Sequence, residues 1–379
     1  MRIDFRSALA VCGLAIASPA HGAPVPGEVP IAMLVDMASG QTLYARNPDR
    51  RFVPASITKV MTAYTAFELM KQGKLAPGTR FTFSEAAADE WYRTGSTMFL
   101  DRGSETAVTD LLMGITTVSA NDGSIVLAEG AAGSVDNWLD LMNAHADALG
   151  MHQSHFGTPN GWPDEGRTFT TARDLVTLAK ALITEHPGLY ARYFGHRGLR
   201  TNGIAQDNYD PITGRIEGAD GIKTGFTNQA GWGFLGSAER DGRRLVMVVA
   251  ASPGMRSRDE TARALMEWGF GAFDSRMLFR SGDTVGHARV QDGAEAAVPL
   301  MADRDIPVAL PENANAEITL RIAYEGPLRA PVEQGEKVAQ LAIFVDGREA
   351  ARVPLAAKKA VAKAGPLQRI ANAVRALWT

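Results

Sequence analysis

The apolar residues of the chain follow two spacings, alternation over short runs and recurrence at every third or fourth position. Residues 31–45 hold two short apolar runs around Ser39-Gly40, a pattern that predicts a β-hairpin. Helical spacing then dominates the middle of the chain. It predicts helices over residues 60–70, 108–115, 135–149, 175–182 and 260–268.

Strand-like patterns return within residues 219–252. Residues 222–227 predict one short strand, and two apolar runs flank Asp241-Gly242, a dipeptide that favours a tight hairpin turn. Strands at both ends with helices between them predict one α/β domain, residues 23–273, whose sheet joins distant parts of the chain.

Shorter β-like runs begin after Asp274 and are separated by Gly, Pro, Asn and Asp. These runs lie at residues 298–300, 308–310, 318–322, 339–345 and 351–353. Strands of this length between frequent turn residues predict a small all-β domain, residues 274–356.

Residues 1–22 carry the pattern of a secretory signal peptide. Arg2 and Arg6 give a positive start, residues 9–16 are apolar, and small residues follow from Ser18. The apolar run is too short to span a membrane, and its flanks fit cleavage. The only cysteine, Cys12, lies inside this segment, so the mature chain has no thiol for a disulfide, a metal or a nucleophile.

Composition and charge narrow the class of protein. The chain is 45% hydrophobic and 21% charged with a net charge of −3, which is typical of globular proteins and argues against nucleic-acid binding. Residues 357–379 form a basic tail with five Lys or Arg and no acid. Residues 366–379 place apolar side chains on one helical face, which predicts an amphipathic helix on an anionic membrane surface. A terminal helix docked on its own protein is the alternative.

The first candidate for chemistry is Ser56-Ile57-Thr58-Lys59. It stands at the start of the first predicted helix, where the spacing places Ser56 and Lys59 on one face. A helix N-terminus favours negative charge, and a partly desolvated lysine can accept the proton of a neighbouring hydroxyl. This pattern suggests an activated serine, but S-x-x-K alone is a weak signal.

Two further motifs strengthen that interpretation. Ser119-Ala120-Asn121 follows the predicted helix 108–115, and Lys223-Thr224-Gly225 lies in the predicted strand 222–227. Together the three form the S-x-x-K, S-x-N and K-T-G set of penicillin-interacting serine enzymes, each in the expected element.

With these motifs the chain resembles the low-molecular-mass penicillin-binding proteins of the D-alanyl-D-alanine carboxypeptidase family. Similar family sequence continues in Asn160-Gly161, in Gly221 to Thr227 and in Gly335 to Val338, so the resemblance covers essentially the whole mature chain. It implies a penicillin-binding/β-lactamase-like serine transpeptidase fold with a small C-terminal all-β domain and a terminal amphipathic helix. One departure is Phe226, where well-known members carry His; we expect it to tune rate or specificity.

The resemblance also implies roles for the motif residues. Ser56 would attack the carbonyl between two terminal D-alanines, with Lys59 as its base. Backbone N–H groups of Ser56 and Phe226 would stabilise the oxyanion. Ser119 would relay a proton to the leaving amine, and Asn121 would hold the substrate amide and Lys59.

The K-T-G segment would bind the rest of the substrate. Lys223 and Thr224, followed by Gly225, would bind the terminal carboxylate, and Arg258 would add a second cation there. Arg256 is close by in the sequence, so the choice between the two arginines stays open. The implied partners are the peptidoglycan stem peptide, β-lactam inhibitors and the membrane surface, and the implied location is the periplasmic face of the inner membrane.

Three alternative functions stay open. A β-lactamase can share the fold, although no E-x-x-L-N segment of the class A type is present. A D,D-endopeptidase would differ mainly in pocket shape, and a weakly catalytic peptidoglycan-binding scaffold would keep the fold without the rate.

Other signals carry less weight, and we expect no cofactor and no metal. Residues 231–236 match G-x-G-x-x-G, but a strand follows rather than a helix, which argues against a dinucleotide loop. His152 and His155 lack a third ligand in the sequence.

Overall fold

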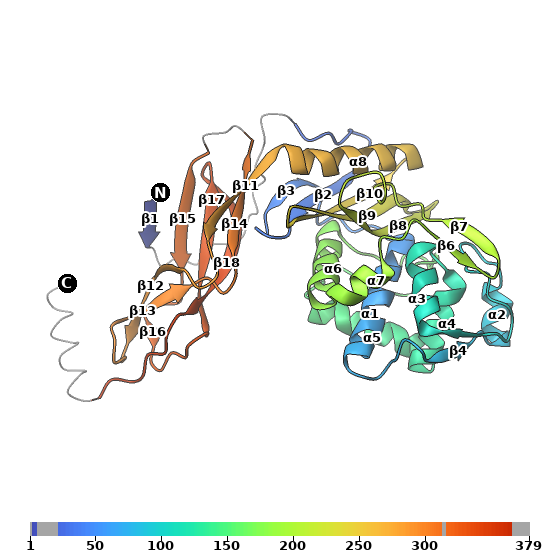
Figure 1. Ribbon diagram of the computed structural model, residues 1–379, viewed down its shortest axis with the longest axis horizontal. Helices are drawn as coiled ribbons and strands as arrows, with labels where there is room; N and C mark the ends of the chain where they lie inside the picture. The colour runs from blue at the N-terminus through green and yellow to red at the C-terminus, as the bar shows by residue number, and fades with distance from the viewer. Residues whose placement is uncertain (1, 6–21, 313–315, 366–379) are drawn as a thin grey trace. The chain divides into compact units, whose positions relative to one another are not determined.

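The computed structural model describes residues 2–5, 22–312 and 316–365 (Figure 1). The chain forms two compact units. One comprises Ala23–Val35 and Tyr44–Phe270, and the other contains the described residues of Met1–Gly22, Asp36–Leu43 and Gly271–Thr379. The predicted domain boundary at residue 274 lies close to the change of unit after Phe270.

The larger unit is built on a five-stranded sheet in the order β3-β2-β10-β9-β8. Its strands are β2 (Ile31–Asp36), β3 (Thr42–Arg46), β8 (Ala219–Thr227), β9 (Gly231–Arg240) and β10 (Arg243–Ser252). The sheet therefore joins the start of the unit to its end, as the sequence predicted. Strand β8 is an outer strand, paired to β9 antiparallel along one edge.

The predicted hairpin at Asp241-Gly242 is confirmed. It connects β9 to β10, which pair antiparallel in register from Arg240↔Arg243. Both turn residues have positive φ, 49° for Asp241 and 75° for Gly242, and this is the conformation that a two-residue hairpin turn needs. Six consecutive buried residues in each strand explain the strong apolar runs.

The predicted helices are present with shifted ends, and the structure contains three others. The predicted helices correspond to α1 (Lys59–Lys71), α3 (Val108–Thr117), α5 (Val135–Ala148), α6 (Ala172–Glu185) and α8 (Met255–Gly271). The helices that were not predicted are α2 (Glu85–Trp91), α4 (Asn121–Ala132) and α7 (Pro187–Tyr193). Helix α8 covers one face of the sheet, and the others lie on the opposite side (Figure 1).

Helix α4 escaped prediction because it is buried nearly all round. Its first eight residues are buried, so no polar stripe marks a helical period. Gly123 lets the helix approach Met98, whose Sδ would lie 3.1 Å from an added Cβ, and Gly130 packs against the ring of Phe81. These two glycines allow close packing, but glycine has a low helix propensity, so the sequence of α4 does not indicate a helix.

The smaller unit is all-β, as predicted. A seven-stranded sheet has the order β1-β15-β17-β18-β13-β12-β16, and β11 pairs with β14. The strands are β1 (Arg2–Phe5), β11 (Phe273–Phe279), β12 (Thr284–Gln291), β13 (Ala297–Met301), β14 (Ile306–Pro311), β15 (Ile318–Ala323), β16 (Leu328–Arg329), β17 (Lys337–Val345) and β18 (Arg348–Ala357). Apolar residues of β12 to β15, β17 and β18 form one core, which includes Val298, Leu341 and Val353.

The tip of the β2–β3 hairpin belongs to the smaller unit, which the sequence did not indicate. Gln41 is 2% exposed, and its side chain donates to Ala309 O (3.0 Å) and accepts from Ala309 N. These two bonds satisfy a buried amide on β14, a partner 268 residues away.

Both predicted terminal segments fall largely outside the described residues. Of residues 1–22 the structure describes Gly22 and β1, which pairs parallel to β15. The predicted amphipathic helix 366–379 lies entirely outside them. Among the described helices, none combines the length and the apolar character needed to cross a bilayer.

Two further strand pairs complete the helical side of the larger unit. Strand β4 (Arg80–Thr82) pairs with β5 (Glu105–Ala107), and β6 (Gly198–Thr201) pairs with β7 (Ile204–Asp207), both antiparallel. From the β6–β7 pair, Gln206 donates to Thr97 O (3.1 Å) and thereby holds the segment that precedes α3.

Candidate active site

Ser56 lies in a 3₁₀ turn, Ala55–Thr58, that leads directly into α1 at Lys59. We predicted that Ser56 lies in the first helical turn, and the structure shows that the tighter turn takes that place. In a 3₁₀ turn side chains three residues apart are eclipsed. This geometry places Lys59 Nζ 2.9 Å from Ser56 Oγ.

Lys59 is completely buried and surrounded by neutral oxygens. Its exposure is 0%, and Nζ donates to Ser56 Oγ, to Asn121 Oδ1 (2.8 Å) and to Asn160 O (2.6 Å). All three donor positions of the ammonium group are thus used. No carboxylate lies within ion-pair distance of Nζ in the described part of the chain, so the charge is hydrogen-bonded but not neutralised.

This environment changes the acidity of the lysine. Burial lowers the pKa of Lys59 well below its usual value, the nearby Lys223 cation lowers it further, and Asp122 acts in the opposite direction. A lysine whose ammonium form is disfavoured in this way can accept the serine proton. The arrangement is that of a nucleophile with its base.

The S-x-N motif spans the loop between α3 and α4. Asn121 is the first residue of α4 and 4% exposed, and its Nδ2 donates to Thr94 O (3.1 Å) while Oδ1 accepts from Lys59. Ser119 has a φ of 63°, a conformation that is strained for a residue other than glycine. Its buried Oγ has no hydrogen-bond partner among the described residues, so it is available to a substrate.

The K-T-G motif lies in β8 and packs directly against the 3₁₀ turn. A Cβ at Gly225 would collide with Pro54 O and lie 3.2 Å from Ile57 N. Only glycine therefore allows the strand to approach the turn this closely. The next residue, Phe226, is 44% exposed, and its ring stacks on Trp232 with the centroids 4.0 Å apart.

Lys223 and Arg258 bring two buried cations to the same region. Lys223 is 4% exposed, and its Nζ donates to Thr224 O (3.0 Å). Burial lowers the pKa of Lys223 to about 7; the Arg258 cation lowers it too, whereas the Asp210 carboxylate raises it. A buried lysine beside an arginine favours an anionic ligand.

The structure separates the two candidate arginines. Arg258 is 1% exposed on α8, donates through Nη1 to Gly233 O (3.3 Å) and interacts electrostatically with Lys223. Arg256 has an 89% exposed side chain and pairs with Glu260 at 2.7 Å on the outside of the same helix. Only Arg258 faces the sheet.

Sequence reasoning assigned no role to several residues that complete the site. Asn160 supplies an acceptor to Lys59, and Gly161 at φ 75° brings this loop so close to the Ala55–Ser56 peptide that an added Cβ would collide with Ala55 O. Asp122 is 1% exposed, and its carboxylate accepts from Met98 N and Leu100 N, both at 3.1 Å. The Asn160-Gly161 turn dipeptide was the only sequence signal for any of these contacts.

Comparison with known families finds two matches. Residues 26–253 match the family described as D-alanyl-D-alanine carboxypeptidase, and residues 273–363 match the family described as penicillin-binding protein 5, C-terminal domain. The first match contains all three motifs, and the second lies within the all-β unit.

Individual relatives indicate the same family as the two family matches. D-alanyl-D-alanine carboxypeptidase DacA of Haemophilus influenzae is 32% identical over 88% of this chain and 85% of its own, and DacA of Escherichia coli (strain K12) is 30% identical over 85% and 81%. A crystal structure of penicillin-binding protein 5 from Haemophilus influenzae superposes with a TM-score of 0.80 at 31% identity, covering 90% of this chain and 99% of that one.

Proposed function

This chain belongs to the D-alanyl-D-alanine carboxypeptidase family of serine peptidases, and we propose that Ser56 is the nucleophile of its reaction, with Lys59 as the base. The enzyme is a hydrolase of the penicillin-binding class. One observation supports this assignment above the others, the fully buried Lys59 Nζ at 2.9 Å from Ser56 Oγ. Each later step uses a group that the fold brings to this pair.

In the acylation step Ser56 Oγ attacks the carbonyl carbon between the two terminal D-alanines. Its proton passes to Lys59 Nζ, the C–N bond breaks, and the leaving amine takes up a proton through Ser119. The orphaned Oγ of Ser119 and the positive φ that presents it support this relay. Loss of free D-alanine leaves an ester on Ser56.

The developing oxyanion is stabilised by the backbone N–H groups of Ser56 and Phe226. The close packing of Gly225 on the 3₁₀ turn supports this pairing, because it fixes the strand and the turn relative to each other before the reaction. Donors that need no reorganisation contribute most of the rate enhancement in such sites.

The substrate is held at both sides of the reacting carbonyl. Lys223, Thr224 and Arg258 bind the terminal carboxylate, since two buried cations lie in this region. Asn121 binds the penultimate amide through its side chain. A water molecule, deprotonated by Lys59, then hydrolyses the ester and restores Ser56. Penicillin mimics the D-alanyl-D-alanine end and acylates the same serine.

One experiment tests the nucleophile and separates the alternatives. Wild type and Ser56→Ala are compared for covalent labelling by a fluorescent penicillin and for D-alanine release from a stem pentapeptide. We expect label and release in wild type and neither in the variant. Unlabelled wild type contradicts the assignment of Ser56.

The other outcomes identify the alternative functions. Penicillin labelling without D-alanine release would support the peptidoglycan-binding scaffold. Rapid hydrolysis of penicillin would support the β-lactamase. Cleavage of cross-linked dimers faster than of pentapeptides would support the D,D-endopeptidase.

We also propose that the enzyme is exported and held peripherally at the periplasmic face of the inner membrane by residues 366–379. The signal-peptide pattern of residues 1–22 and the amphipathic, basic tail support this location. Deleting residues 366–379 should move the protein from the membrane fraction to the soluble fraction without loss of penicillin labelling. Retention of the truncated protein on membranes contradicts the anchor.

A further inference from the structure

A second cluster of reactive side chains lies in the larger unit, at the end of α1 remote from Ser56. We propose that Glu68, Glu185 and His186 form a binding site for a divalent transition-metal ion of the Zn²⁺ class. Each residue offers one ligand atom, and these atoms all lie within 4.8 Å of one another. Glu68 is nine residues beyond Lys59 on α1, about 14 Å along the helix, so this site is separate from the catalytic pair.

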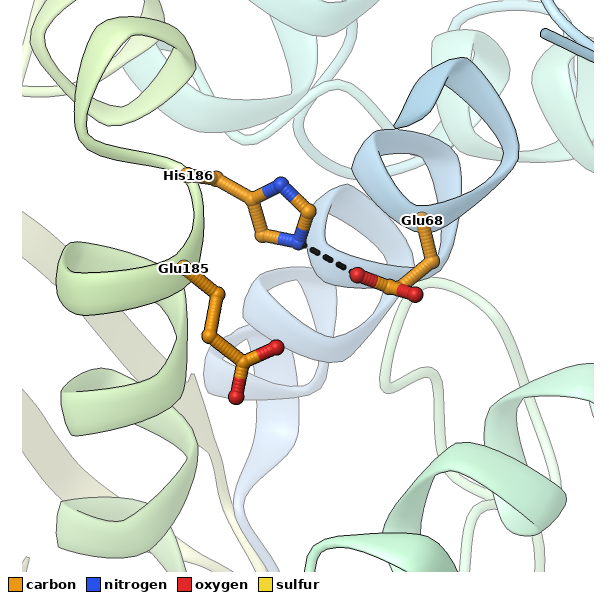
Figure 2. A group of neighbouring side chains, drawn as sticks. All are labelled: Glu68, Glu185 and His186. Atoms are coloured by element: carbon orange, nitrogen blue, oxygen red, sulfur yellow. Dashed lines mark ion pairs between the residues drawn. The ribbon is translucent and has the colours of Figure 1, made fainter. Parts of the chain in front are cut away.

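Two helix ends bring the cluster together. Glu68 lies in the last turn of α1, Glu185 is the last residue of α6, and His186 caps α6. Figure 2 shows the three side chains converging from these two helices. A helix C-terminus carries a partial negative charge, so both helices add to the attraction that the two carboxylates exert on a cation.

His186 provides the independent indication of a ligand. The residue is 5% exposed, and its Nε2 points at Glu68, 2.8 Å from Oε1 (Figure 2). This contact is an ion pair, and Nε2 is among the buried atoms without a hydrogen-bond partner in the described residues. Two atoms that ligate the same tetrahedral Zn²⁺ at about 2.1 Å lie about 3.4 Å apart, so the two side chains would separate slightly when they bind an ion.

Lys71 contacts both carboxylates, so a metal ion would have to displace its ammonium group. Lys71 Nζ is 3.0 Å from Glu68 Oε1 and 3.7 Å from Glu185 Oε2, and Tyr64 donates its hydroxyl to Glu185 Oε2 (3.2 Å). The Lys71 side chain is 53% exposed, so it can swing into solvent when a metal ion takes its place. The same exposure, with 41% for the Glu185 side chain, leaves a path from solvent to the cluster.

The ligand set selects the type of ion. One imidazole nitrogen and two carboxylates suit Zn²⁺ and neighbouring transition ions, whereas Mg²⁺ and Ca²⁺ prefer oxygen ligands alone. Water would fill the remaining coordination positions. A bound ion would tie the end of α1 to the end of α6 and stabilise the helical half of the unit.

The test is a calorimetric titration of the metal-free full chain with Zn²⁺, repeated with Co²⁺ to obtain its visible absorption and with Mg²⁺. We expect one Zn²⁺ per chain, a rise of the melting temperature on binding, and no response to Mg²⁺. Glu185→Gln, a change of an exposed side chain, should weaken binding roughly tenfold or more. His155→Ala, which removes an exposed histidine elsewhere, should bind as wild type does.

Lys71→Met gives the sharpest outcome. Removing the competing ammonium group should tighten Zn²⁺ binding, whereas a role of the cluster as an ion-pair network alone predicts no binding in either protein. The proposal is overturned if Zn²⁺ does not saturate a site, if Glu185→Gln and His186→Ala bind as wild type does, or if Lys71→Met weakens binding. His186→Ala is interpreted only with a melting curve that shows it folded.

Discussion

The two ends of α1 carry one lysine each, and the two side chains have opposite surroundings. Lys59 is fully buried and meets neutral oxygens, whereas Lys71 is exposed and meets two carboxylates. Burial lowers the pKa of Lys59, and hydrogen bonding to Glu68 raises that of Lys71. The same side chain on one helix is thus a proton acceptor at one end and a permanent cation at the other.

The comparison shows which property makes a lysine a base. Both lysines have oxygen neighbours, so contact with oxygen is not the difference. The difference is that the neutral oxygens around the buried Lys59 offset the charge of its ammonium group less than two carboxylates offset that of the exposed Lys71. Desolvation without a carboxylate contact, together with the 2.9 Å contact between Nζ and Ser56 Oγ, therefore identifies Lys59 as the base.

Replacing each lysine by methionine gives the largest expected contrast. Lys59→Met should lower the rate of acylation by penicillin by about two to four orders of magnitude, because general-base catalysis contributes that much. Lys71→Met should leave the rate unchanged. Stopped-flow measurement of acylation checks both, and a rate loss of similar size in Lys71→Met would break the comparison.

Removing Lys223 should affect the active site in two ways. Lys223→Met should raise KM for the pentapeptide about tenfold or more, because a hydrogen bond to a charged group is lost. It should also raise the pKa of Lys59, since the Lys223 cation lowers that pKa. The acidic limb of kcat/KM would then move to higher pH in the variant.

The pH profile of the wild type sharpens the same point. Lys59 must be neutral, so kcat/KM should rise as the pH passes through the lowered pKa of Lys59. Lys223 must be charged to bind the carboxylate, so KM should increase as the pH rises above its pKa of about 7. A profile of kcat/KM that rises without limit to pH 10 would contradict this assignment of Lys223.

A smaller effect is expected from Gly225→Ala. The added methyl group would collide with Pro54 O and push β8 away from the turn that carries Ser56. Overpacking of this kind typically costs about 1–3 kcal/mol. Chemical denaturation measures the stability, and acylation should slow by more than the stability loss explains. Gly188→Ala, at a helical glycine with open space around it and no positive φ, is a control for methyl addition.

The smallest effect should come from Phe226→Ala. The stack on Trp232 contributes about 0.5–1.5 kcal/mol beyond burial, and the backbone N–H of residue 226 remains. We expect a slightly lower melting temperature and unchanged acylation by penicillin. A large fall in acylation would show that the ring takes part in the reaction.

Sequence predicted the parts of this enzyme that depend on local spacing. The Ser56–Lys59 pair depends on two residues that are three positions apart, and the hairpin turn depends on the adjacent residues Asp241 and Gly242. By contrast, the acceptor that Asn160 offers to Lys59 is 101 residues away, and the burial of Lys59 is a property of packing. Motif knowledge could name Lys59 as the base, but only the structure gives the reason.

Long-range packing also determines two further features that the sequence could not predict, the Glu68–His186 contact and the choice between two arginines. Glu68 and His186 meet only because α1 and α6 end at the same place, and no spacing in the sequence indicates it. Arg258 and Arg256 differ by two positions, and helix α8 turns one inward and the other outward. Choosing between them required the three-dimensional position of α8.

Two glycines press against the turn that carries Ser56, Gly161 from one loop and Gly225 from the edge strand, and each is followed by an exposed aromatic residue. Trp162 is 40% exposed and Phe226 is 44% exposed. The glycines bring their backbones against the turn that carries the serine, and the aromatic side chains that follow are partly exposed. Substituting these aromatic residues would therefore alter the surface beside the reactive serine while leaving in place the glycine contacts that hold its turn.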